Sequence, residues 1–296
     1  MLREKQFAMQ VLTADILFFG YGKLTSCLID KLLKSGYSIL CVSDSLGDQK
    51  LIHRKQLKTI SYKDAINSTI TSTITIFTWR DKNVLDKFSS NLLRWLESSN
   101  FKTKKSFFLS SASVYRDSSL PLSESKLNLE TNVEKNDKFI LEECLMALMK
   151  KKNANHINLR ISNVYGSTLN HGLISSIIKS PEKEVNIKLF NNLFVIRDYI
   201  YIDDVINAIF QLMNAQPNFN CINISTGVGS SILRIIELFS FYGYAFSKDL
   251  QVLDATNVKK SSILDCTQLA NTVFWKPLSI DEGIKRIVNK KNLNYS

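Results

Sequence analysis

The sequence predicts an α/β fold: a doubly wound parallel sheet with a smaller, interleaved C-terminal lobe. Two observations carry this prediction. Short apolar runs typical of buried strands alternate with segments of about 10 to 15 residues whose apolar positions recur at helical spacing. Strands that alternate with helices in this way form parallel sheets covered on both faces. The 296 residues suffice for one large domain, or for a domain with a smaller partner.

The first elements form a predicted βαβ unit. Residues 15–20, DILFFG, are an apolar run that stops at a glycine, as a buried strand entering a turn does. Residues 24–36, LTSCLIDKLLKSG, have apolar positions at helical spacing and end in Gly36, the expected C-cap. Residues 37–44, YSILCVSD, then read as a second buried strand.

The same alternation continues and then loosens after residue 166. We predict three more strands and two helices in the first part, and mixed shorter elements in the second. We therefore expect a cofactor-binding domain at 1–166 and a partly interleaved substrate-binding lobe at 167–296. The predicted strands are 73–79, 106–112, 156–162, 185–190 and 221–225, and the predicted helices are 83–98, 137–151, 171–179, 231–242 and 281–289.

Composition excludes several classes of protein. No apolar run approaches the roughly 20 residues that span a bilayer, and the first apolar run has no cleavage site after it. The five cysteines include no C-x-x-C pair, which argues against a disulfide framework and a zinc site. We expect a cytoplasmic protein without metal. The net charge of +11 is spread along the chain, which favours a solvated lysine-rich surface over a nucleic-acid patch.

The stretch FFGYGKLTS places Gly20 and Gly22 where a strand turns into a helix. Such a turn lets a pyrophosphate approach the helix N-terminus, here the backbone of Lys23 and Leu24, as in a Rossmann-like dinucleotide site. The third position of G-x-G-x-x-G is Thr25, and the alternative is a tight turn that binds nothing.

The second strand supplies the residue expected to choose the cofactor. It ends at Ser43 followed by Asp44. An acidic side chain there bonds the adenosine ribose, so NAD is favoured over NADP. NADP stays the alternative, because the sequence leaves the register at this strand end open by one residue.

Longer motifs then agree in order along the chain. They are FFLSSASVY (107–115), LRISNVYG (159–166), RDYIYIDDVINAI (197–209), INISTGVGSSILRIIELF (222–239) and the closing FWKPLSIDEGIKRIV (274–288). Together they resemble the extended short-chain dehydrogenase/reductase family, the NAD-dependent epimerases and dehydratases that act on nucleotide sugars. The resemblance covers nearly the whole chain.

The resemblance implies a catalytic Ser, Tyr and Lys. Ser111 matches the serine that bonds the reacting oxygen, although a polar strand end is its alternative interpretation. Lys138 matches the lysine that lowers the tyrosine pKa and holds the nicotinamide ribose. The stretch NVEKNDK lies over the family pattern N-P-Y-G-x-S-K, so Glu134 stands at the tyrosine position. A glutamate with a reference pKa of about 4 is ionised at neutral pH and cannot replace the phenol as proton donor.

The substrate side resembles the family more closely. Asn163 matches the asparagine that contacts the nucleotide sugar, and Arg197 the arginine that pairs with its diphosphate. For Arg197 the alternative is a surface ion pair with Asp198, and for Asp204 we expect helix capping. The spacing Tyr244 to Lys248 also fits Y-x-x-x-K, but one such match is expected by chance in this chain.

Three functions follow as expectations. The first is an NAD(P)-binding nucleotide-sugar epimerase, dehydratase or reductase with an altered acid/base residue. The second is a non-catalytic binding or regulatory protein that keeps the fold. The third, weaker one is a nucleic-acid surface on the same fold. Family members often dimerise through the helices at 83–98 and 137–151, so the resemblance also implies a homodimer. The segment IFTWRD (76–81) replaces the family's H-L-A-A-like stretch beside the cofactor.

Overall fold

The computed structural model covers residues 1–296 and forms two compact units, each discontinuous in sequence. Unit 1 comprises residues 1–109 and 139–158, and unit 2 comprises residues 110–138 and 159–296. The expected division into a cofactor-binding part and a substrate lobe at residue 166 stays a proposal. The structure describes residues 9–44, 55–78, 90–130, 132–133, 136–169, 172–180, 184–185, 189–190, 193–246, 252–253 and 260–293.

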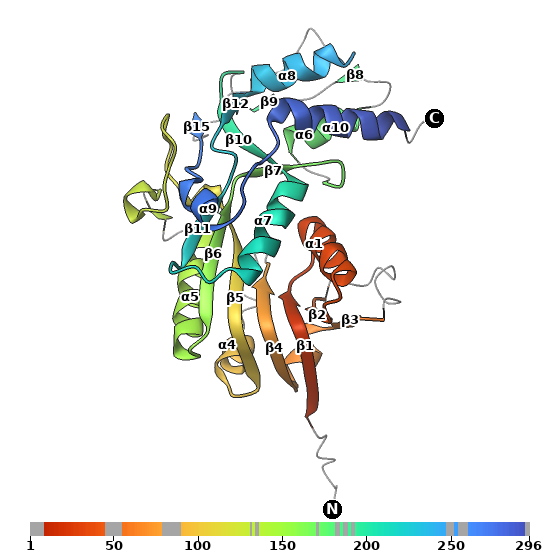
Figure 1. The fold of residues 1–296 in the computed structure, drawn as a ribbon. Helices are drawn as coiled ribbons and strands as arrows, with labels where there is room; N and C mark the ends of the chain where they lie inside the picture. The colour runs from red at the N-terminus through yellow and green to blue at the C-terminus, as the bar shows by residue number, and fades with distance from the viewer. Residues whose placement is uncertain are drawn as a thin grey trace, which may run out of the picture. The chain divides into compact units, whose positions relative to one another are not determined.

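The largest sheet has seven strands in the order β3-β2-β1-β4-β5-β6-β11 (Figure 1). The pairs from β3 to β5 are parallel, which confirms the doubly wound α/β fold. Strand order reverses between β1 and β4, the place where such sheets bind ligands. The bounds are β1 Gln10–Phe19, β2 Ile39–Val42, β3 Leu57–Ile60, β4 Ser68–Phe77, β5 Phe101–Ser111, β6 Asn155–Ile161 and β11 Cys221–Ile224.

Three of these strands begin earlier than the sequence predicts. β1, β4 and β5 start at Gln10, Ser68 and Phe101, about five residues before their continuous apolar runs. In the first half of each strand buried and exposed residues mostly alternate, whereas the residues that follow are largely buried. The first halves of these strands have one face in contact with solvent. Threonine and lysine at those positions interrupt the apolar run, so an apolar pattern predicts only the second half of each strand.

The helices of unit 1 pack on the sheet through apolar side chains. Helix α4 (Ser90–Glu97) and helix α5 (Asp137–Lys151), of which residues 139–151 belong to unit 1, supply Trp95, Leu96, Leu145 and Met149 to a core shared with Phe19. The predicted helix 137–151 is therefore confirmed at both ends. Only the end of the predicted helix 83–98 is described, as α4.

Of two further helices of unit 1, one is followed by a glycine and one is short. α1 spans Lys23–Lys34, and its C-cap is Ser35 rather than the expected Gly36. Gly36 follows the cap with a φ of +87°, the left-handed position that glycine commonly fills after a helix. α2 (Tyr62–Ile66) was not predicted, because five residues show no periodicity. It begins where the Ser61 hydroxyl accepts a hydrogen bond from the Asp64 N–H.

Unit 2 contains a smaller sheet beside several helices. Strand β10 (Ile196–Tyr201) pairs with β12 (Gly229–Ser231), β15 (Ser261–Ser262) and β7 (Asn163–Tyr165). Of the predicted strand 185–190, the structure describes the ends: β8 (Glu184–Val185) pairs with β13 (Ala245–Phe246), and β9 (Leu189–Phe190) pairs with β14 (Val252–Leu253). The helices are α6 Leu173–Ile178, α7 Ile202–Asn214, α8 Ile232–Phe241, α9 Thr267–Thr272 and α10 Ile280–Leu293, with single 3-10 turns η1 Ala112–Val114 and η2 Lys126–Asn128.

The core of unit 2 joins α6, α8 and α10 to the small sheet. Tyr165, Ile177, Ile235, Phe239 and Ile284 are buried together in it. Among the residues that the structure describes, no helix is long and apolar enough to cross a membrane.

Candidate functional site

The turn after β1 needs glycine at its first position. Gly20 has a φ of +91°, and its N–H donates to the Val42 carbonyl at 2.9 Å. A Cβ at Gly20 would lie 1.8 Å from the carbonyl oxygen of Thr78, at the end of β4. Both the backbone angle and this close approach exclude a side chain, so Gly20 is required by the fold itself.

Gly22 differs, because its backbone does not demand glycine. It is the N-cap of α1 with φ −166° and ψ −177°, an extended conformation, and a Cβ there would meet no atom within 4 Å. The first turn of α1 has no side-chain cap and no acidic residue. Its leading N–H groups, including those of Lys23 and Leu24, have no acceptor within the helix. The open space at this helix N-terminus therefore fits a phosphate group.

Thr25 explains the departure from the third glycine. Its side chain is 2% exposed, and its Oγ1 lies 3.2 Å from the Oγ1 of Thr78. The contact between α1 and the end of β4 is thus a hydroxyl pair rather than a bare backbone approach. Thr78 is also the last described residue of the IFTWRD segment, whose residues 79–81 lie outside the described part of the chain.

The end of β2 separates the two residues that the sequence could not distinguish. Ser43 is buried, and its N–H donates to the Ile60 carbonyl at 3.0 Å. Asp44 is exposed, and its Oδ1 accepts a hydrogen bond from the Tyr62 N–H at 3.0 Å. An ionised carboxylate accepts about four hydrogen bonds, so Asp44 retains capacity to accept from a ligand hydroxyl. Its role as the ribose ligand stays a prediction.

Ser111 and Lys138 both belong to unit 2 and are half-buried. The Ser111 Oγ accepts a hydrogen bond from the Ser113 N–H at 3.1 Å and caps η1. This contact uses an oxygen lone pair and leaves the hydroxyl hydrogen to be donated elsewhere. Lys138 lies in the first turn of α5, and its N–H donates to the Asn136 Oδ1 at 3.0 Å. Glu134 lies outside the described residues.

A buried polar cluster follows Ser111 that the sequence did not single out. The Tyr115 hydroxyl donates to the Asn223 Oδ1 at 2.7 Å and accepts from the Arg160 Nη1 at 3.1 Å. All three side chains are at most 5% exposed, and the guanidinium lies 4.9 Å from the centroid of the tyrosine ring. Burial raises the pKa of the Tyr115 phenol. Tyr115 therefore anchors the segment after Ser111 through its bonds to Asn223 and Arg160.

Asn163 and Arg197 occupy one face of the small sheet. Asn163 aligns with Tyr199 in the parallel pair β7–β10, and Arg197 is two residues before Tyr199. Residues two apart in a strand share a face, so the structure brings these two predicted substrate residues together. The Asn163 Nδ2 donates to the Asp198 carbonyl at 3.2 Å, and the Arg197 Nη1 donates to the Ile196 carbonyl at 2.7 Å.

Asp198 points to the other face and cannot form the surface ion pair weighed for Arg197. Its side chain is fully buried. The Oδ1 accepts from the N–H and the hydroxyl of Thr226 at 3.0 and 2.8 Å and from the Ser162 hydroxyl at 3.3 Å, and the Oδ2 accepts from the Gly227 N–H at 3.0 Å. Burial raises the pKa of this carboxyl, while the bonds from Thr226 and Gly227 oppose the rise.

The expectation that Asp204 caps α7 is wrong. The N-cap is Tyr201, which forms no side-chain cap, and Asp204 lies inside the first turn. Its Oδ2 accepts a hydrogen bond from the Leu278 N–H at 2.9 Å and so ties the chain before α10 to α7. An acidic residue in the first turn of a helix still interacts favourably with the helix dipole.

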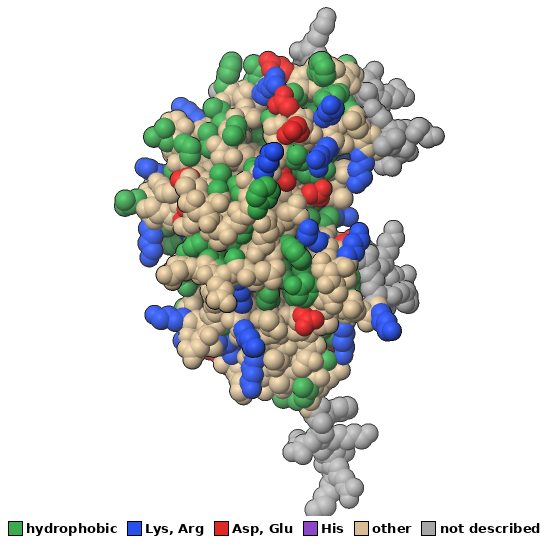
Figure 2. Space-filling model, in the orientation of Figure 1, with side chains coloured by type: hydrophobic (Ala, Val, Ile, Leu, Met, Phe, Trp, Pro, Cys, Tyr) green, Lys and Arg blue, Asp and Glu red, His purple; other side chains and the backbone are tan. Residues whose placement is uncertain are grey.

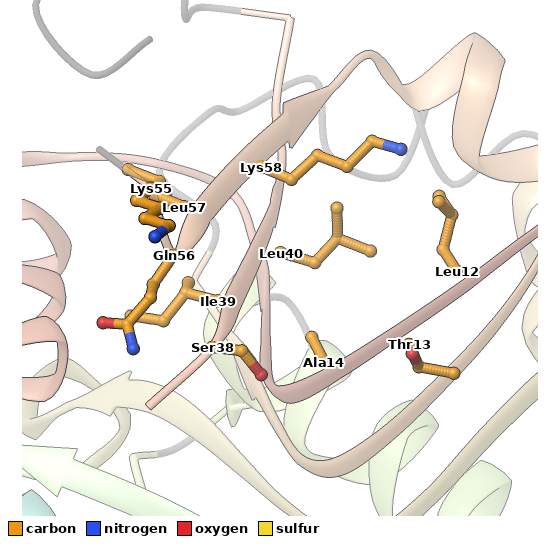
Figure 3. A pocket seen from close by; sticks show the side chains of 10 residues that line it. All are labelled: Leu12, Thr13, Ala14, Ser38, Ile39, Leu40, Lys55, Gln56, Leu57 and Lys58. Carbon is orange, nitrogen blue, oxygen red and sulfur yellow. The ribbon is translucent and has the colours of Figure 1, made fainter. Parts of the chain in front are cut away.

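Neither a cavity elsewhere in unit 1 nor the surface charge competes with this site. A cavity of about 190 Å³ is lined by residues from the starts of β1, β2 and β3 (Figure 3). Ligands of such folds bind at the carboxyl ends of the strands, the opposite end.

Lys and Arg side chains are scattered over the face in Figure 2 rather than gathered in one patch. Over the described ranges, no cluster of three His, Cys, Asp or Glu could hold a metal.

Comparison with known proteins agrees with this geometry. The chain is 25% identical over 217 residues to a dTDP-4-dehydro-6-deoxyglucose reductase from Escherichia coli, covering 70% of this chain and 68% of the relative. It is 30% identical over 174 residues to a UDP-glucose 4-epimerase from Mycoplasma genitalium, and this match spans about half of each chain, 51%. The crystal structure of a UDP-glucuronic acid 4-epimerase from Bacillus cereus with UDP-glucuronic acid and NAD has the same fold, with TM-score 0.78, 21% identity and coverage of 96% of this chain and all of that one.

A model of the NAD dependent epimerase/dehydratase family matches residues 20–225, from the glycine turn after β1 to the end of β11. This match covers more than half of the chain and includes the segments that carry Ser111, Lys138, Asn163 and Arg197. The resemblance inferred from the motifs is confirmed, and the chain belongs to the NAD dependent epimerase/dehydratase family.

Proposed function

We propose that the protein binds NAD and a nucleoside-diphosphate sugar, as an epimerase, dehydratase or reductase with an altered acid/base residue. The observation that carries the proposal is the pair of glycines after β1. Gly20 is required by the turn, whereas Gly22 leaves open space at an uncapped helix N-terminus. A fold that needed only a tight turn would not need the second glycine.

Within the proposal each described residue has one task. NAD, when bound, supplies a hydride acceptor for a carbon of the sugar. The N–H groups of Lys23 and Leu24 bind the pyrophosphate, and the Asp44 carboxylate accepts from the adenosine ribose. NADP is the alternative cofactor if Asp44 does not fill this role.

The residues of unit 2 bind the reacting parts. The Lys138 ammonium donates to the nicotinamide ribose, and the Ser111 hydroxyl donates to the reacting sugar oxygen. Arg197 pairs with the diphosphate, and Asn163, on the same sheet face, contacts the sugar. Both roles are supported by position, because Asn163 and Arg197 lie on the face of the small sheet opposite the buried Asp198.

Proton transfer is the step of this function for which the family's residue is not present. This gap favours a second candidate function. Glu134 stands at the family's tyrosine position. A carboxylate that stays ionised cannot donate the proton that a phenol provides. The alternative function is a non-catalytic protein that binds the same ligands and regulates or sequesters them.

Calorimetric titration with NAD tests the cofactor site. We expect the parent to bind NAD, Gly22→Ala to weaken binding and Gly22→Val to abolish it, because a branched side chain fills the space for the phosphate. Thermal unfolding of each variant is the control, since an extended φ accommodates any residue and the midpoint should stay unchanged. Unchanged NAD affinity in Gly22→Val would remove this site assignment.

A panel of UDP-, GDP- and dTDP-sugars then separates an enzyme from a binding protein. Reduced-cofactor absorbance after mixing with NAD or NADP, or conversion of the sugar, supports the enzyme. Binding of a nucleotide sugar without either signal supports the second candidate. Arg197→Lys should weaken binding of the sugar nucleotide while leaving NAD affinity unchanged, because an ammonium cannot form the bidentate diphosphate contact.

A further inference from the structure

The residue immediately before α5, Asn136, bonds the N–H of Lys138 and the carbonyl of Ser113, two residues after Ser111. We propose that Asn136 is a positioning residue that fixes the backbone around Lys138 relative to the turn that orients Ser111. The inference rests on the function proposed above, and it concerns residues 110–138, all in unit 2.

The first contact is to the helix that carries Lys138. The Asn136 Oδ1 accepts a hydrogen bond from the Lys138 N–H at 3.0 Å. Asn136 immediately precedes α5, so this bond is an N-cap to the second residue of the helix. The Asn136 N–H in turn donates to the Val133 carbonyl at 2.8 Å, which fixes the backbone from which the side chain projects.

The second contact is to the turn that carries Ser111. The Asn136 Nδ2 donates to the Ser113 carbonyl at 3.2 Å. The N–H of the same Ser113 donates to the Ser111 Oγ at 3.1 Å. One residue, Ser113, therefore has its carbonyl held by Asn136 and its amide on the Ser111 hydroxyl.

The chemistry of the asparagine side chain distinguishes this role from simple capping. Ser, Thr and Asp cap helices about as well as Asn. None of them offers an amide donor beside the capping oxygen, and an aspartate would set a negative charge against the Ser113 carbonyl. Capping alone therefore does not require Asn, whereas a residue that accepts from α5 and donates to the Ser111 turn at once does.

The test uses substitutions that separate the two contacts. Asn136→Asp keeps the cap and removes the donor, and Asn136→Ala removes both. Asn128→Asp is the matched control: it adds the same charge and removes an amide donor that bonds the Ser123 carbonyl at 3.0 Å and the Ser123 Oγ at 3.1 Å. The measurements are thermal unfolding, calorimetric NAD affinity, and hydrogen exchange of the Ser113 and Lys138 amides by NMR.

We expect Asn136→Asp to lower the unfolding midpoint less than Asn136→Ala does, because it loses one of the two hydrogen bonds, and to keep the protection of the Lys138 amide. Exchange of the Ser113 amide should become about fivefold faster, and NAD affinity should fall about fivefold, the effect of losing one net hydrogen bond. Asn136→Ala should also expose the Lys138 amide. The control should change neither the Ser113 exchange nor the affinity. A residue that only stabilised the helix would lower the midpoint without this split.

Two results distinguish failure of the inference from failure of the proposed function. If Ser113 exchange in Asn136→Asp equals that of the parent, or if NAD binds Asn136→Asp and Asn136→Ala as tightly as the parent, Asn136 positions nothing. If the parent does not bind NAD while Ser113 exchange rises fivefold, the link between Asn136 and the Ser111 turn is upheld and the proposed cofactor function fails.

Discussion

At the scale of single residues, the two glycines after β1 differ in what requires them. Gly20 has a positive φ and lies against the Thr78 carbonyl, and Gly22 has neither constraint. A strained φ for a residue with a side chain costs roughly 1–3 kcal/mol, and a steric clash adds to this. Replacing Gly20 should therefore destabilise the fold, and replacing Gly22 should weaken ligand binding.

Urea unfolding of two alanine variants checks this division. We expect Gly20→Ala to lower the free energy of unfolding by about 3 kcal/mol or more, because a Cβ would collide with backbone rather than with a flexible side chain. Gly22→Ala should change it by less than about 0.5 kcal/mol. Equal losses in both variants would contradict the distinction.

Glu134 is the second decisive residue, and the prediction at this position concerns rate. Glu134→Tyr restores a phenol four residues before Lys138, whose ammonium would favour the phenolate. General acid/base catalysis contributes about 10² to 10⁴ in rate, so turnover of a suitable nucleotide sugar should rise well above that of the parent.

Steady-state assays of the parent, Glu134→Tyr and Glu134→Gln distinguish the outcomes. Rapid turnover by the parent that both substitutions abolish would make the carboxylate itself the base. Absence of turnover in all three, with cofactor and sugar nucleotide both bound, would favour the non-catalytic function.

At the scale of elements, strands β5 and β6 carry a buried polar contact within unit 1. The His156 Nδ1 lies 2.8 Å from the Ser106 Oγ, and its Nε2 lies 3.0 Å from the Asn158 Oδ1. The amide oxygen can only accept, so Nε2 carries the proton and Nδ1 accepts from the Ser106 hydroxyl. Both ring nitrogens therefore have hydrogen-bond partners when the ring is neutral.

This contact predicts an acid-sensitive stability. Burial lowers the pKa of His156 from 6.5 to about 4. The unfolded chain therefore binds a proton more readily than the folded one. The stability is fully present above pH 6.5, is lost as pH falls from 6.5 towards 4, and the loss levels off below 4, with a total of about 3 kcal/mol. Urea unfolding across this pH range measures the loss.

A histidine variant isolates the contribution of this ring. His156→Gln should remove most of the slope between pH 6.5 and 4, and its stability at pH 7 should be lower because a buried hydrogen bond is lost. A slope that survives in His156→Gln would assign the titration to other groups.

At the scale of the whole molecule, the net charge of +11 invites a nucleic-acid interpretation. The scattered Lys and Arg side chains in Figure 2 favour weak, non-specific attraction on that face. Non-specific binding of this kind has dissociation constants of about 10⁻⁴ to 10⁻⁶ M at physiological salt. Filter binding with a mixed-sequence RNA should therefore give values in or above this range. A submicromolar constant with steep salt dependence, relieved by competing RNA but not by NAD, would favour the nucleic-acid function instead.

Local patterns in the sequence were enough to determine the fold class and the family. The spacing of apolar residues predicts the buried parts of β1 and β2 and both ends of α5. The backbone preference of glycine predicts where α1 stops. These signals are local, so a single chain displays them. The assignment of Glu134 to the tyrosine position also comes from a local motif, and it stays a prediction.

Only the tertiary structure decided which residues far apart in the sequence contact one another. The Tyr115 hydroxyl bonds Asn223 across 108 positions, and a Cβ at Gly20 is excluded by Thr78, the residue after β4. The first halves of β1, β4 and β5, exposed on one face, and the five-residue α2 were also beyond the sequence. The physical reason is that periodicity reports how much of a residue is buried, whereas the identity of the neighbour that buries or bonds it depends on how distant segments pack.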